Sequence, residues 1–74
     1  MKVDYKKIEN IYIEKLKVGD FFINNENIYV VIDDEMTSRF FCNYIKALRL
    51  NDYVSCVFSF GSVVQKVEVK SIDN

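Results

Sequence analysis

The side chains of this chain that could do chemistry are its carboxylates and two cysteines, because the 74-residue sequence contains no histidine. Without histidine, the commonest general base, the Ser-His and Cys-His nucleophile pairs and the usual zinc ligands are missing. Cys42 and Cys56 form no Cys-x-x-Cys pair, and each sits in an apolar run, where a free cysteine behaves as a small hydrophobic residue. We therefore interpret both cysteines as core residues, and their spacing leaves open whether they are neighbours.

Three consecutive carboxylates, Asp33, Asp34 and Glu35, could offer oxygen ligands to Mg²⁺ or Ca²⁺. Consecutive residues point in different directions, however, and the spacing of a calcium-binding loop is missing, so a solvated turn is the favoured interpretation. Asp20 follows Gly19 and is interpreted as a turn residue rather than as half of an acid–base pair. The sequence thus predicts no catalytic residue, no metal site and no cofactor, and it favours a protein that is not an enzyme.

The charges are spread unevenly, although the formal net charge is only -1. Residues 20–35 contain five acids and no Lys or Arg (net -5), whereas residues 36–51 contain Arg39, Lys46 and Arg49 and no acid (net +3). The two segments could neutralise each other on neighbouring strands. Alternatively, the acidic segment could dock on a basic surface of another protein and use charge to steer the encounter.

A β-hairpin is the first element expected to position these side chains. Two apolar runs, residues 21–23 and 28–32, are rich in Phe, Ile, Tyr and Val, which suit a half-buried strand. The Asn-Asn-Glu-Asn stretch between them supplies side chains that tolerate turn conformations. The hairpin is therefore predicted to run from about Phe21 to Asp33.

The rest of the chain also favours strands. We expect a strand from about Ile11, one in the apolar run from Phe40 to Leu50 with a helix as the competing interpretation, and one from Val54 to Phe60. In the last strand, Val63, Val67 and Val69 are expected to face one way, and Lys66, Glu68 and Lys70 the other. Residues 1–10 form an ambiguous N-terminal extension, either loose or a short helix.

One mostly β domain over residues 11–74 follows from these elements, with five or six short strands. A small closed or partly open barrel of the SH3-like kind is the expected architecture, because an open sheet would leave its strand edges exposed. A chain of this length is near the size at which stability is marginal. Association with further copies would therefore help it, and a homo-oligomer is compatible with the sequence.

Several short motifs carry a resemblance to known proteins. They are Leu-Lys-Val-Gly-Asp-Phe-Phe (16–22), Asn-Ile-Tyr-Val-Val (27–31), Ala-Leu-Arg-Leu (47–50) and the closing Val-rich strand. Over roughly residues 16 to 70 the chain resembles short, poorly characterised bacteriophage and mobile-element β-barrel proteins. The resemblance implies a small accessory β domain and offers no functional residues to carry over. The N-terminal extension departs from the pattern.

The expected location is the cytoplasm of a bacterial host cell, with no membrane partner. The first residues lack the apolar stretch of a secretory leader. No apolar run approaches the roughly 20 residues that a membrane helix needs.

Eleven aromatic residues, five Tyr and six Phe, motivate the leading functional hypothesis, in which some rings face a protein partner. Phe21 and Phe22 are consecutive, so their rings point to opposite faces of an extended strand. The hypothesis is a non-enzymatic phage or mobile-element protein that binds, and thereby inhibits, a bacterial host or defence protein. Its expected contact residues are Phe22, Glu26, Tyr29, Asp33 and Asp34.

The alternative hypothesis is a nucleic-acid- or nucleotide-binding barrel of SH3-like or OB-like form. Exposed aromatic rings would stack on bases while basic side chains contact phosphates. The expected residues are Arg39, Tyr44, Lys46, Arg49 and Tyr53. The orientation of Phe22 decides how the hairpin is interpreted, because a buried ring would make the hairpin part of the scaffold.

Overall fold

The computed structural model describes residues 2–32 and 44–73 and shows a mostly β fold, as expected. Its elements are β1 (Lys2–Tyr12), the 3-10 helix η1 (Ile13–Lys15), β2 (Phe21–Asn24), β3 (Asn27–Val31), β4 (Tyr44–Arg49), β5 (Val54–Ser59) and β6 (Val63–Asp73). The predicted strands in the hairpin, near the basic segment and at the C-terminal end are confirmed. Asp33, Asp34, Glu35, Arg39 and Cys42 lie outside the described residues.

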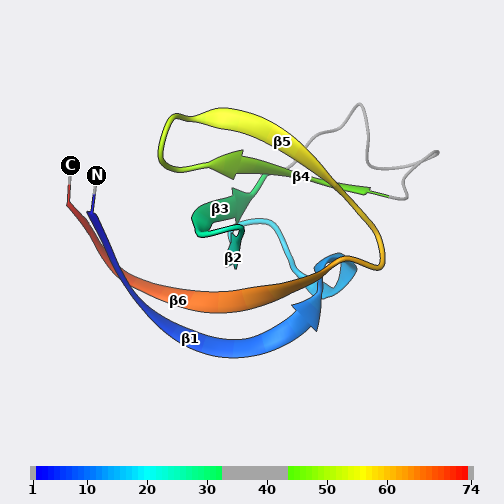
Figure 1. Ribbon diagram of the computed structural model, residues 1–74, viewed down its shortest axis with the longest axis horizontal. Coiled ribbons are helices and arrows are strands. Elements are labelled where there is room, and N and C mark those ends of the chain that lie inside the picture. The colour runs from blue at the N-terminus through cyan, green and yellow to red at the C-terminus, as the bar shows by residue number, and fades with distance from the viewer. Residues whose placement is uncertain (1, 33–43, 74) are drawn as a thin grey trace.

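All six strands form one antiparallel sheet in the order β1-β6-β2-β3-β4-β5. The long strands β1 and β6 run together along one side of the molecule, β4 and β5 lie on the other side, and β2 and β3 lie between them (Figure 1). Strands β1 and β5 do not pair with each other in the described part of the chain. The described strands therefore form a curved open sheet that is not closed into a barrel.

Two hydrogen bonds tie the end of β1 to the turn between β5 and β6. The Ile13 N–H donates to the Ser62 carbonyl oxygen at 2.9 Å, and the Gly61 N–H donates to Glu14 Oε1 at 2.9 Å. The second bond is the main cause that lowers the pKa of Glu14. We call this the η1 end of the sheet.

The predicted hairpin is confirmed, with a two-residue turn. Asn25 and Glu26 have φ angles of 50° and 67°, which a type I′ turn requires at both central positions. Upstream, the Asp20 N–H donates to the Lys17 carbonyl oxygen, and Gly19 adopts the positive φ of 93° that a type II turn needs at its third position. Asp20 Oδ2 accepts the Lys17 N–H at 2.8 Å, so Asp20 is a turn residue as predicted.

The interpretation of the N-terminal extension was wrong. Strand β1 begins at Lys2, well before the expected start near Ile11, and it pairs with β6 along its length. The pairing has one extra residue in β6, Lys70, beside Asp4 and Tyr5, and one in β1, Ile8, and the extra Ile8 breaks the two-residue alternation that marks a strand in a sequence. The register nevertheless places Lys6 opposite Glu68 and Glu9 opposite Lys66, pairs of opposite charge that favour it.

The main core lies on one face of the sheet. Its buried members are Ile13, Leu16, Phe22, Tyr29, Val31, Ala47 and Val64, and the half-buried Ile11, Ile45, Cys56 and Phe58 pack against them. The Phe22 and Tyr29 rings stack with centroids 5.2 Å apart, and the Phe58 ring meets both edge-on. Each such pair contributes roughly 0.5–1.5 kcal/mol beyond the burial of its area.

The opposite face of the central strands is also apolar. Directly paired residues share a face, so the register places Val67, Phe21, Val30 and Leu48 in one row across β6, β2, β3 and β4. Val67 is buried and the other three are half-buried. This arrangement explains why these strands read as continuous apolar runs rather than as alternating ones. It also confirms that Val63, Val67 and Val69 share a face of β6, with Lys66 on the other.

Candidate functional site

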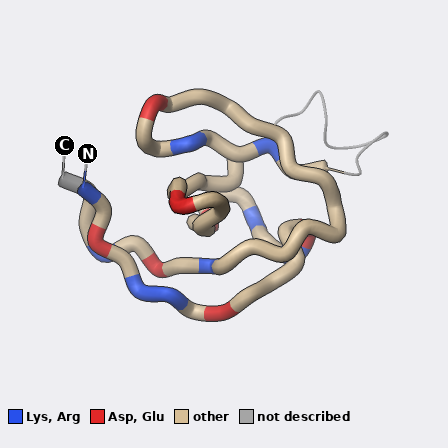
Figure 2. Tube along the Cα trace, viewed as in Figure 1, with Lys and Arg blue, Asp and Glu red and all other residues tan. Residues whose placement is uncertain are grey.

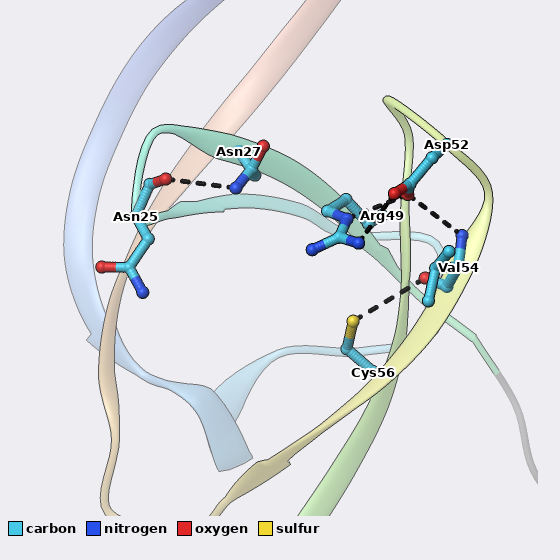
Figure 3. Close-up of polar contacts among 6 residues, drawn as sticks. All are labelled: Asn25, Asn27, Arg49, Asp52, Val54 and Cys56. Atoms are coloured by element: carbon cyan, nitrogen blue, oxygen red, sulfur yellow. Dashed lines mark hydrogen bonds and ion pairs between the residues drawn. The ribbon is translucent and has the colours of Figure 1, made fainter.

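Two turns meet at the end of the sheet opposite η1, which we call the turn end. One is the β2–β3 turn with Asn25 and Glu26, and the other connects β4 to β5 over residues 50–53. The Leu50 N–H donates to the Ile28 carbonyl oxygen at 2.9 Å and so ties the second turn to β3. Figure 3 shows side chains from both turns at this end of the molecule.

A recess of about 270 Å³ lies between the two turns and the start of β1. It is lined by Val3, Glu26, Asn27, Ile28, Leu50 and Asn51. The apolar lining comes from three different strands or turns, and the amides and the Glu26 carboxylate are the polar groups among the lining residues. Ligand sites commonly combine an apolar wall with a few polar groups in this way. We call this the turn-end recess.

The β4–β5 turn is held by a two-bond contact between Arg49 and Asp52 (Figure 3). Arg49 Nε donates to Asp52 Oδ1 at 2.9 Å, and the terminal Nη2 donates to Oδ2 at 2.7 Å. The same Oδ1 accepts the Val54 N–H at 3.3 Å. The bond with Asp52, and then one with the Tyr29 hydroxyl, raise the pKa of Arg49, while the bond from Arg49 lowers the pKa of Asp52.

This contact fixes Tyr53 in an unusual backbone conformation. The Tyr53 φ of 58° lies in the left-handed region, which costs a residue other than glycine on the order of 1–3 kcal/mol. Its N–H donates to the Arg49 carbonyl oxygen at 2.8 Å, which closes the turn. Tyr53 is nevertheless 65% exposed, so this turn, whose Leu50 and Asn51 line the recess, also holds an aromatic side chain in solvent.

The residues predicted for a protein interface divide into three groups. Phe22 and Tyr29 are 0% and 5% exposed and lie in the core, which corrects the expectation that they contact a partner. The reason is the hairpin register, which pairs them on the core face and turns Phe21 to the other face. Glu26 is exposed and lines the recess. Asp33 and Asp34 lie outside the described residues.

The residues predicted for nucleic-acid binding do not form one surface. Tyr44 and Lys46 alternate with Arg49 along β4, so they face opposite sides of the sheet. Arg49 and Tyr53 come together in the β4–β5 turn, where Asp52 already binds the guanidinium. Arg39 lies outside the described residues.

Two ion pairs are seen for described residues of the acidic and basic segments. Arg49 binds Asp52 of its own turn, and Asp20 Oδ2 lies 4.0 Å from Nζ of Lys66 in β6. Asp33, Asp34, Glu35 and Arg39 lie outside the described residues, so neutralisation between the two segments stays a prediction. Basic and acidic residues also alternate along β1 and β6, as Figure 2 shows.

Sequence reasoning missed Val3, Ile28, Leu50 and Asp52 as site residues. Arg49 and Asp52 are three residues apart just before a predicted strand, and this spacing was a usable local signal for a turn held by an ion pair. The recess had no such signal, because its lining residues are brought together only by the pairing of distant strands.

No family model matches the chain, and the curated proteins and the solved structures likewise yield no match. Within residues 2–32 and 44–73, no group of three or more Cys, Asp or Glu side chains is arranged to hold a metal ion. The same residues include no helix with the length and apolarity required to cross a membrane.

Proposed function

We propose that this protein is a non-enzymatic binding module that contacts another protein through Tyr53 and the turn-end recess. The observation that carries the proposal is the exposed Tyr53 side chain, whose left-handed backbone lies in the turn closed by the Arg49–Asp52 contact, together with the recess that Leu50 and Asn51 of the same turn help to line. Tyrosine is enriched among residues that dominate binding energy, and a ring that is already positioned loses little freedom on binding.

The recess and its rim define the chemistry of the partner surface. An apolar side chain of the partner would fill the space lined by Val3, Ile28 and Leu50. The Glu26 carboxylate at the rim favours a Lys or Arg beside that side chain. This retains Glu26 from the predicted acidic interface, while Tyr53 and the recess replace the buried Phe22 and Tyr29.

The resemblance to bacteriophage and mobile-element proteins extends the proposal to a bacterial host or defence protein as the partner, met in the cytoplasm. Binding would inhibit that protein by covering one of its working surfaces. A relationship of this curved sheet to partly open SH3-like barrels, with β1 and β5 as its two edges, belongs to the same proposal.

Site-specific crosslinking tests the interface. A photoreactive phenylalanine analogue at position 53, produced in bacterial cells and irradiated, should form an adduct with one cellular protein. The same analogue at position 18 is the control, because Val18 is also exposed but lies in the turn before β2. An unlabelled Glu26→Lys change should reduce the adduct at position 53. If position 53 yields no adduct with another protein, or the same adducts as position 18, the proposal is wrong.

Nucleic-acid or nucleotide binding stays as the alternative prediction, with less support because its residues lie on two faces of the sheet. Fluorescence anisotropy with single-stranded DNA, RNA and cyclic nucleotides, at low and moderate salt, tests it. Phosphate binding would weaken as salt rises and in Arg49→Ala. Flat curves under all conditions would eliminate it.

A further inference from the structure

Strand β1 lies at one edge of the sheet, and no described strand pairs with its outer side. From Lys2 to Lys7 the strand itself is regular. The irregularity beside Asp4 and Tyr5 arises from an extra residue in β6, Lys70, whereas Ile8 is the extra residue in β1. The regular stretch therefore exposes backbone donors and acceptors in a form that another strand could pair with.

We infer that two copies of this chain associate by antiparallel pairing of these β1 edges, with the two-fold axis at Tyr5. In this register Asp4 of each copy faces Lys6 of the other, and Val3 faces Lys7. Opposite charges directly across a strand pair are favourable, and the symmetry forms the Asp4–Lys6 pair twice. The inference concerns a second copy of the chain and does not depend on the proposed protein partner.

The alternating charges of β1 disfavour the other symmetric registers. Centring the axis on Asp4, Lys6 or Lys7 would place two like charges directly opposite each other. Centring it on Val3 would pair only residues 2–4 of the regular stretch, whereas the Tyr5 register pairs residues 3–7. The charge pattern thus selects one register for the edge.

In this register, each row of side chains that runs across β6 and β1 on one face of the sheet would be extended by residues of the second copy. On one face, Lys6 is opposite Glu68 of its own β6 and would gain Asp4 of the second copy on its other side. On the opposite face, Tyr5 is opposite Val69 of its own chain, and its ring is 37% exposed. Pairing would place the two Tyr5 rings together between two Val69 side chains, and so cover apolar surface that is now in water.

Charge reversal tests the register. Light scattering over a dilution series should show a dimer of the unaltered protein that dissociates on dilution. Asp4→Lys and Lys6→Glu should each be monomeric, since each places two like-charge pairs in the junction. An equal mixture of the two variants should dimerise again, because positions 4 and 6 are then both basic in one chain and face two acidic side chains in the other.

Two controls separate association from folding. Lys17→Glu makes the same charge change as Lys6→Glu in the turn before β2 and should dimerise like the unaltered protein. Circular dichroism checks that Lys6→Glu, which faces Glu68, remains folded. A monomer at every concentration, single variants that dimerise normally, or folded single variants whose mixture stays monomeric would each overturn the inference.

Discussion

The η1 end and the turn end of the sheet are each held by one carboxylate, but the side chain held at the first end is buried and the one held at the second end is exposed. Glu14 accepts the Gly61 N–H and fastens η1, whose first residue, Ile13, is fully buried. Asp52 binds Arg49 and the Val54 N–H, and the turn that it holds leaves Tyr53 in solvent. The same kind of contact therefore closes the core at one end and presents a side chain at the other. Under the proposed function, the η1 end serves stability and the turn end serves recognition.

Substitutions in the core should have the largest effect on the free energy of unfolding. Phe22→Ala removes a fully buried ring from its contacts with Tyr29 and Phe58, and we expect a loss of about 3–5 kcal/mol in the free energy of unfolding. Phe21→Ala, on the other face of the same strand, is the matched control and should cost clearly less because Phe21 is only half-buried. Urea denaturation measures both. Equal losses would contradict the assignment of the core to the Phe22 face.

Adding a side chain at the η1 end should strain the backbone without a clash. Gly61 has a φ of 90°, and a Cβ built there would meet no atom within 4 Å. Gly61→Ala should therefore lower the free energy of unfolding by about 1–2 kcal/mol through conformation alone. Thermal unfolding followed by circular dichroism measures this. An unchanged midpoint would show that the turn adapts and that the Glu14 contact does not depend on its present shape.

At the turn end, a substitution should raise the free energy of unfolding instead of lowering it. Tyr53→Asn keeps a side chain that tolerates the left-handed region and removes a ring that is mostly in solvent, so stability should rise by up to about 1 kcal/mol. The same variant, added as an unlabelled competitor, should fail to reduce the crosslinked adduct formed from position 53. A Tyr53→Asn protein that is less stable and still competes would reverse the roles given to the two ends.

Acid should weaken both carboxylate contacts, and this is the smallest effect. The pKa of Glu14 is lowered mainly by the Gly61 N–H, and that of Asp52 mainly by Arg49. A lowered pKa in the folded state means that each contribution is complete above the ordinary carboxyl pKa and is lost as the pH falls through the folded value. Urea midpoints between neutral and acidic pH should fall less steeply in Glu14→Gln and Asp52→Asn. Curves parallel to that of the unaltered protein would argue against both contacts.

Local sequence signals account for the parts of this fold that were predicted correctly. The Asn25-Glu26 turn, Gly19 and Asp20 act within a few residues, and the alternation in β5 is regular. Strand β1 was missed because the extra residue Ile8 shifts its alternation. The facing of Phe22 rather than Phe21 toward the core could not be predicted, because both faces of the central strands are apolar.

The candidate site depended on contacts that a single sequence does not display. Val3, Ile28 and Leu50 meet because β1, β3 and the β4–β5 turn are brought together by the order of the sheet. The exposure of Tyr53 depends in turn on the pairing of Arg49 with Asp52. Charge counting along the chain singled out Glu26 and Arg49, but it gave no sign that Arg49 binds Asp52.

The pairing of β1 with β6 also sets the order in which the protein can fold. Residues 2–12 are made well before their strand partner, residues 63–73, whereas β2 and β3 are joined by a two-residue turn. Hairpins form within microseconds, but contacts between distant segments wait for both to be available. The β2–β3 hairpin is therefore able to form during synthesis, while β1 stays unpaired until β6 emerges. A newly made chain thus carries a free strand that other extended segments can capture before its own partner arrives.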